Sequence, residues 1–154
     1  MSVSDFAQLG VLAVTAVAIF ISLRGLRDQL WLQTFSEYTR RYAEALDPLP
    51  AAARLHDGHW DLHEISAADH QALLAAARRY LNLCSEEFYL QSRHRIDKET
   101  WLVWTAGMRS TMKLPALRDA WELLGVEYEY YRPFHSFMTE IANNPSEGRR
   151  GATS

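Results

Sequence analysis

The most constraining feature of the sequence is an uncharged run near its start. No Asp, Glu, Lys or Arg occurs from Phe6 to Leu23, and fourteen of these eighteen residues are apolar. As an α-helix the run would be about 27 Å long, close to the roughly 30 Å hydrocarbon core of a bilayer. Buried helices of soluble proteins usually carry a polar stripe, which this run lacks. The run therefore predicts a transmembrane helix over residues 6–23, with the lipid bilayer around it.

Two alternatives to a membrane helix fit this run less well. A cleaved signal peptide begins with basic residues and ends at small residues. Here residues 1–5 hold no Lys or Arg, and the run is followed by Arg24-Gly-Leu-Arg27-Asp28. A helix buried in a soluble protein is the second alternative, although eighteen uncharged residues in a row are rare outside membranes. Both alternatives stay open beside the transmembrane prediction.

The basic residues around the run predict its orientation. No Lys or Arg precedes it, whereas Arg24, Arg27, Arg40 and Arg41 follow it. The positive-inside rule then places the N-terminus outside and the chain from residue 24 onward in the cytoplasm. The sequence thus predicts a single-pass protein of the inner (plasma) membrane. The lone cysteine, Cys84, fits a reducing compartment.

Composition narrows the classes of function. Sixteen Lys and Arg against nineteen Asp and Glu give a net charge of −3, which argues against a nucleic-acid partner. One cysteine cannot build a disulfide framework or a multi-thiolate metal site. The sequence also has no glycine-rich phosphate loop and no order of Ser, His and Asp that suggests a triad. We therefore expect no cofactor.

Helical periodicity dominates the rest of the chain. The only candidate strand, residues 126–131, has no second strand to pair with, so we expect helix or linker there. The sequence predicts an all-α fold, with one transmembrane helix followed by a small bundle of four to five amphipathic helices. The expected parts are an extracytoplasmic N-terminus at 1–5, a transmembrane helix at 6–23, a juxtamembrane helix at 24–46, a linker at 47–65, a helical bundle at 66–142 and a disordered tail at 143–154.

Capping residues locate the helices of the predicted bundle. Ser66 with Asp69 three positions on is typical of a helix N-terminus, and Asp97 is a second N-cap candidate. Pro115 suits a first helical turn, and Gly125 is a natural C-cap. The predicted helices run from Ala67 to about Gln91, from Asp97 to about Lys113, from Pro115 to Gly125 and from Pro133 onward.

Glu87 is the first candidate site residue. On its predicted helix it lies about 60° from the centre of the apolar face, at the edge of the core near Tyr80. A carboxylate there needs hydrogen-bond donors or a cation, which Trp indole groups, a Tyr hydroxyl or Arg109 could supply. Either Glu87 forms a structural polar bridge within the bundle or it faces a ligand. Cys84, at the centre of the same face, is expected to be an inert buried thiol.

A histidine-rich segment is the second candidate. His59 and His63 are four residues apart, so a helical turn would place both imidazoles on one side, and zinc commonly takes such nitrogens. Gly58 weakens the helix that this geometry needs, and the glutamate of the zincin pattern is missing. The alternatives are a solvated acidic loop and a patch that responds to pH.

A tryptophan and methionine stripe is the third candidate. Large apolar side chains recur at helical spacing at Trp101, Trp104 and Met108, and Trp121 follows on the next predicted helix. Such stripes are most often part of a core. They also suit a partner surface, because Trp and Met are enriched in protein interfaces. These four residues are the predicted interaction surface.

One longer pattern resembles a known group of proteins. It consists of Arg79-Tyr-Leu-Asn-Leu-Cys-Ser-Glu-Glu-Phe-Tyr-Leu90, then Ile96-Asp97, Trp101, Trp104, Gly107-Met108, Pro115, Arg118 and Ala120-Trp121. The order resembles small bacterial single-pass membrane proteins of unknown function that carry a short helical cytoplasmic domain. The resemblance covers about residues 24–142. It implies the fold and topology given above and no particular activity.

These features support three hypotheses of function. The preferred one is a membrane-anchored helical module for protein–protein interaction or scaffolding, which binds a protein partner or a copy of itself. Anchoring would raise the local concentration for weak contacts. The alternative is a membrane-tethered sensor or accessory component, of a stress-response or phage-defence type, that binds a small ligand in the bundle through Glu87. A metal-dependent enzyme is third, because no motif supplies a nucleophile, a base and a charge stabiliser together.

Overall fold

The computed structural model describes residues 22, 24–26, 29, 32–54 and 65–145. The transmembrane helix predicted at 6–23 lies outside the described residues, except for Ser22. Among the helices that are described, none combines the length and the apolar character that a bilayer crossing needs. The chain divides into two compact units, residues 1–41 and 42–154.

In the first unit, residues 32–41 are helical and mostly exposed. The Arg40 guanidinium donates to both carboxylate oxygens of Glu37, at 2.7 and 2.9 Å. Both side chains are about half exposed, so this pair of neighbouring helix residues contributes only a few tenths of a kcal/mol.

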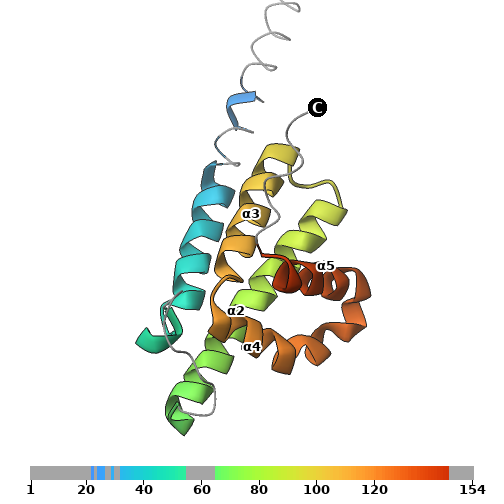
Figure 1. Ribbon diagram of the computed structural model, residues 1–154. Helices are drawn as coiled ribbons and strands as arrows, with labels where there is room; N and C mark the ends of the chain where they lie inside the picture. The colour runs from blue at the N-terminus through green and yellow to red at the C-terminus, as the bar shows by residue number, and fades with distance from the viewer. Residues whose placement is uncertain (1–21, 23, 27–28, 30–31, 55–64, 146–154) are drawn as a thin grey trace, which may run out of the picture. The chain divides into compact units, whose positions relative to one another are not determined.

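The second unit is all-helical over its described residues, which confirms the predicted all-α bundle (Figure 1). It opens with helical residues 42–46, whose Tyr42 and Leu46 side chains pack against the core. The elements that follow are η1 (Ala51–Arg54), α2 (Ala67–Ser92), α3 (Lys98–Thr111), α4 (Pro115–Leu124), η2 (Gly125–Tyr131) and α5 (Arg132–Asn143), where η marks a 3-10 helix.

The predicted helix starts are confirmed by their caps. The Asp69 backbone N–H donates to the Ser66 hydroxyl at 3.0 Å, and that of Thr100 donates to the Asp97 carboxylate at 2.8 Å. Each bond satisfies one of the free N–H groups of a first helical turn. Pro115 occupies the first turn of α4, where its missing N–H costs nothing.

Gly125 is the C-cap of α4, but it does not reverse the chain. Its φ of −54° and ψ of −35° are right-handed, so the chain passes directly into η2. Of the two alternatives expected for residues 126–131, helix or linker, the structure confirms the helix. In consequence α5 begins at Arg132, one residue before the predicted start.

The core of the second unit centres on Phe134, at the start of α5. Its ring centroid lies 5.6 to 6.5 Å from those of Phe88, Trp121, Tyr128 and Tyr131. Small buried residues let α2 and α4 approach closely, namely Ala76, Ala77, Ala116 and Ala120. Within the predicted linker, Leu49 and Ala53 are buried and belong to this core, whereas residues 55–64 lie outside the described residues.

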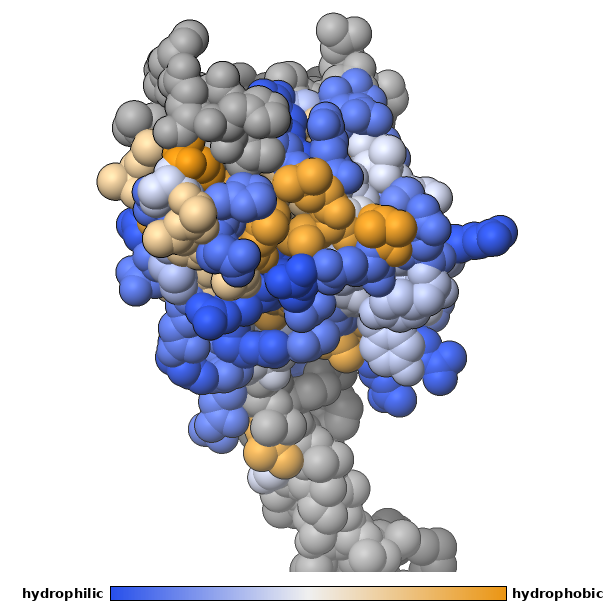
Figure 2. Space-filling model, turned by 90° about the horizontal axis from the view of Figure 1, so that it is seen from below, coloured by the Kyte–Doolittle hydropathy of each residue, from blue (hydrophilic) through white to orange (hydrophobic). Residues whose placement is uncertain are grey.

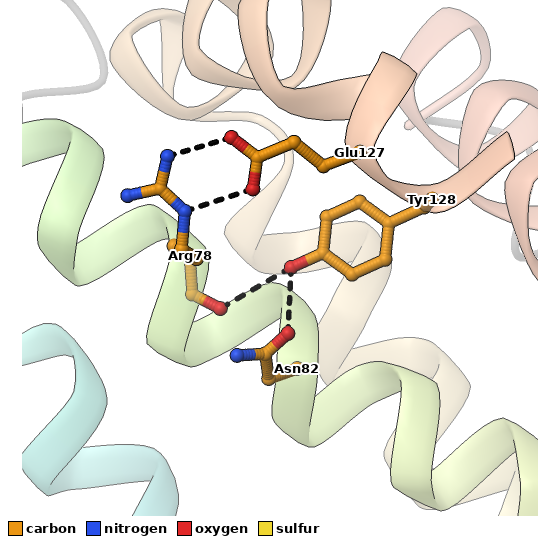
Figure 3. Close-up of polar contacts among 4 residues, drawn as sticks. All are labelled: Arg78, Asn82, Glu127 and Tyr128. Carbon is orange, nitrogen blue, oxygen red and sulfur yellow. Dashed lines mark hydrogen bonds and ion pairs between the residues drawn. The ribbon is translucent and has the colours of Figure 1, made fainter. Parts of the chain in front are cut away.

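A polar clamp fixes η2 to the middle of α2 (Figure 3). Arg78 donates to both Glu127 carboxylate oxygens, at 2.9 and 2.6 Å, and the Tyr128 hydroxyl donates to the Asn82 side-chain oxygen at 2.8 Å. Arg78 and Glu127 are nearly half exposed, so their pair adds at most about 1 kcal/mol. The ring of Tyr128, in contrast, is buried. Its hydrogen bond to Asn82 therefore fixes the position of η2 at least as firmly as the ion pair does.

A tight turn closes the other end of α2. The N–H groups of His94 and Arg95 donate to the carbonyls of Gln91 and Leu90, each at 2.9 Å. This is the bond pattern of a Schellman cap, which needs a left-handed residue after the C-cap. His94 supplies it with a φ of 53°. The backbone between α2 and α3 is thus held in a defined shape.

Candidate functional site

A buried polar cluster lies where α2, α3 and residues 42–46 meet. We define it by five residues: Tyr42, Tyr80, Cys84, Glu87 and Thr111. Glu87 is only 7% exposed, so the structure places this carboxylate further inside than the core edge expected from the sequence. Tyr80, Cys84 and Glu87 follow one another at helical spacing along α2 and therefore share its buried face.

Tyr42 joins the start of the second unit to this cluster. Its hydroxyl hydrogen-bonds that of Thr111 on α3, and its ring meets Tyr80 edge-on with centroids 5.7 Å apart. Burial raises the pKa of Tyr42, while the bond with Thr111 lowers it and the charges of Cys84 and Glu87 raise it. The neutral hydroxyl is therefore the form that the fold favours.

Burial also holds the Tyr80 hydroxyl and the Cys84 thiol of the cluster in their neutral forms. Burial raises the pKa of the Tyr80 hydroxyl and that of the Cys84 thiol well above their usual values, and the Glu87 charge raises the latter further. A thiolate is the reactive form of cysteine, so Cys84 is not an activated nucleophile. Among the described residues, the buried hydroxyls of Tyr80 and Thr105 have no hydrogen-bond partner. Cys84 and Thr111 lie close enough to Tyr80 to influence its pKa, but neither forms a well-aligned hydrogen bond with it.

The sequence suggests Arg109 as a cation for Glu87. In the structure, Arg109 donates hydrogen bonds to the end of α5. Its guanidinium donates to the Glu140 carboxylate and to the Asn144 carbonyl, both at 3.1 Å. Asn144 is the C-cap of α5, where carbonyls lack partners within the helix. Arg109 thus ties α3 to the C-terminal end of α5.

The predicted interaction surface is partly wrong. Met108 and Trp121 are buried in the core, at 2% and 5% exposure, so they cannot meet a partner in this fold. Trp101 is half-buried and packs between Phe88 and Phe137, with centroids 6.2 and 5.5 Å away. Trp104 is also half-buried. Periodicity located the stripe but could not distinguish a core-facing side from a partner-facing one.

The proposed metal pair lies outside the described residues, since His59 and His63 both fall in 55–64. Within the part of the chain that the structure describes, no group of three or more His, Cys, Asp or Glu side chains is placed to hold a metal ion.

Sequence reasoning missed an exposed apolar surface at the junction of α4 and η2. Leu123, Val126 and Tyr130 are 48%, 66% and 82% exposed, and Glu122 and Glu129 are exposed beside them in the chain. We call these five residues the acidic–apolar face. The alternation of residues 126–131 could not have revealed it, because it groups the buried Tyr128 with the exposed Val126 and Tyr130. Seen from below the view of Figure 1, the surface shows hydrophobic side chains gathered between hydrophilic ones (Figure 2).

Comparisons of this chain with protein-family models, with curated proteins and with solved structures give no match. The resemblance to small bacterial single-pass proteins therefore stays a prediction from sequence.

Proposed function

We propose that this protein is a membrane-anchored helical module that binds another protein or a second copy of itself. The anchor is the uncharged run of residues 6–23, and the basic residues after it favour a single-pass arrangement in the inner (plasma) membrane with the helical unit in the cytoplasm. The proposal is supported by composition, by helical architecture and by exposed apolar side chains.

The observation that carries the interaction role is the acidic–apolar face. Val126 and Tyr130 expose most of their surface although the core beside them is closely packed. Large apolar side chains that share an exposed surface with charged ones are typical of a protein-binding site. Tyrosine is also enriched among the residues that dominate binding energy.

Membrane anchoring is tested by fractionation and thiol accessibility of the full chain. The protein should sediment with membranes and resist extraction by high salt. In a Cys84→Ala background, Ser2→Cys should react with an impermeant thiol reagent in intact cells, and Ser154→Cys should not. Full-length protein in the supernatant without detergent would overturn the anchor.

The interaction role is tested with two exposed valines. Val126→Asp lies in the acidic–apolar face, whereas Val103→Asp lies on α3 and is a matched control with similar exposure, 57% against 66%. Cross-linking in native membranes should give complexes that Val126→Asp loses and Val103→Asp keeps. Equal cross-linking of both variants and the natural chain would show that this face binds nothing.

The buried polar cluster supports a second candidate, a sensor or accessory component that binds a small ligand. The observation in its favour is that two buried hydroxyls, Tyr80 on α2 and Thr105 on α3, have no hydrogen-bond partner among the described residues. Native mass spectrometry of the purified full chain should then show a bound compound. It should be lost in Glu87→Gln and kept in Glu86→Gln, which changes the exposed neighbour.

A further inference from the structure

A group of basic side chains surrounds the tight turn between α2 and α3. Arg93, Arg95 and Lys98 are exposed, and we call these three residues the basic turn. Among the described residues none of them forms an ion pair, although Arg93 lies over the Tyr89 ring, 5.9 Å from its centroid. The Schellman cap fixes the backbone that carries Arg93 and Arg95, so binding has little backbone entropy to remove there.

Two acidic residues lie close to the basic turn in sequence. The Asp97 carboxylate is engaged with the first turn of α3, where it accepts from the backbone N–H and the hydroxyl of Thr100. Glu99 is exposed one position after Lys98. The basic turn keeps three cations against these two anions, together with the exposed ring of Tyr89.

The acidic–apolar face has the opposite character. Glu122 and Glu129 form no ion pair among the described residues, and they flank exposed Leu123, Val126 and Tyr130. The nearby Glu127 is already engaged with Arg78. Within the described part of the chain, this face therefore offers two carboxylates without an ion pair around an apolar centre. The basic turn offers cations around an aromatic ring.

The two surfaces cannot meet within one chain. The clamp holds η2 against Arg78 and Asn82 of α2, whereas the basic turn begins at Arg93. Eleven to fifteen helical residues separate these points, which is about 16–23 Å along α2. Ion pairs need contact within about 4 Å. The complementary charges are thus left for another molecule.

We propose that the basic turn of one copy docks on the acidic–apolar face of a second copy. Two different surfaces then meet, which gives a head-to-tail contact that builds chains or closed rings. The proposal rests on the interaction role above and names the partner as this same protein. Anchoring in one membrane would raise the local concentration for such a contact and hold the copies in a common orientation.

Charge reversal tests the pairing with two full-length copies that carry different tags and are co-expressed in the same membrane. Arg93→Glu with Arg95→Glu reverses the turn, and Glu122→Arg with Glu129→Arg reverses the face. Either reversal made in both copies should lower co-purification at least about tenfold, because like charges then oppose each other. When both copies carry all four changes, the charges are exchanged and co-purification should be restored.

The control is Arg79→Glu with Lys113→Glu. Both residues are exposed, and each lies about fifteen residues along the chain from the basic turn. This control changes the net charge by the same amount as the reversal of the turn, and it should leave co-purification unchanged. Circular dichroism of each variant establishes that it is folded. Co-purification of the natural chain should also weaken as salt is raised.

Three results would overturn the proposal. One is co-purification that neither reversal alters. Another is a loss that the four changes together do not repair, which would mean that a different anionic molecule holds the turn. The third is an equal loss in the control. If Val126→Asp abolishes complexes while the charge reversals do not, the interaction role stands and only the head-to-tail pairing fails.

Discussion

Two buried tyrosines offer a matched test of how hydrogen bonding stabilises this fold. Tyr80 and Tyr128 are 1% and 3% exposed, and both belong to the core. The Tyr128 hydroxyl donates to Asn82 at 2.8 Å, whereas the Tyr80 hydroxyl has no partner among the described residues. Replacing each with phenylalanine removes one oxygen atom from the same core, and we expect opposite effects on stability.

The magnitudes follow from what each hydroxyl does. Tyr128→Phe removes one good hydrogen bond and leaves Asn82, which is exposed and can bind water instead, so the loss is about 1 kcal/mol. Within the described part of the chain nothing hydrogen-bonds the buried Tyr80 hydroxyl, and leaving a buried hydroxyl without a partner costs about 1–3 kcal/mol. Tyr80→Phe removes that cost and opens only a small space, so it should stabilise by about 1 kcal/mol. The two variants should therefore differ by about 2 kcal/mol.

Urea unfolding followed by far-ultraviolet circular dichroism is the appropriate assay. Tryptophan fluorescence is unsuitable, because the Trp121 ring lies 6.0 Å from that of Tyr128 and would report the substitution itself. For a unit of this size, 1 kcal/mol corresponds to about 4–8 °C in Tm. A Tyr80→Phe variant as destabilised as Tyr128→Phe would refute the reasoning, since it would show that Cys84 or Thr111 satisfies the Tyr80 hydroxyl.

Three further predictions concern stability. Gly125→Ala should stabilise by about 0.5–1 kcal/mol in the same urea assay, because φ is −54° and an added Cβ would meet only ordinary contacts at 3.5 Å or more; a lower midpoint would contradict this. Phe134→Ala should cost about 3–5 kcal/mol, since its ring is completely buried; a thermal transition within about 5 °C of the natural one would contradict this. Alkaline pH should destabilise the fold. The raised pKa values of Cys84 and Tyr80 mean that the unfolded chain loses protons first, above 9.0 and 10.0 respectively. The free energy of unfolding is then unaffected by these groups below those pH values. Above them, each group lowers it by about 1.4 kcal/mol for every pH unit. Cys84→Ala should reduce the slope above pH 9.0, and an unchanged slope would exclude the thiol as a cause.

Local signals in the sequence located most of the helices correctly. Ser66, Asp97 and Pro115 each begin a helix where the sequence predicted, because capping depends only on groups within one turn of the chain. Gly125 shows the limit of such signals. Glycine permits a left-handed reversal without requiring it, and packing against Trp121 and His135 accompanies a right-handed continuation.

Side-chain roles were harder to predict than helices. Glu87 could be placed near the core because its angle on the helix follows from a period of 3.6 residues. Its association with Tyr42 could not be predicted, because the two residues lie far apart in the chain. The same limit explains why the sequence leaves Met108 and Trp121 open between core and partner surface, since periodicity groups residues on one face without showing what covers that face.

The sequence by itself determined the helical class, the main helix starts and the apolar faces, all of which depend on neighbours along the chain. Only the tertiary structure decided which apolar side chains the core covers and which stay exposed, as at Val126 and Tyr130. It also decided that η2 is clamped to the middle of α2, which keeps the basic turn and the acidic–apolar face apart. Burial and long-range pairing are set by segments distant in sequence, and no local pattern contains that information.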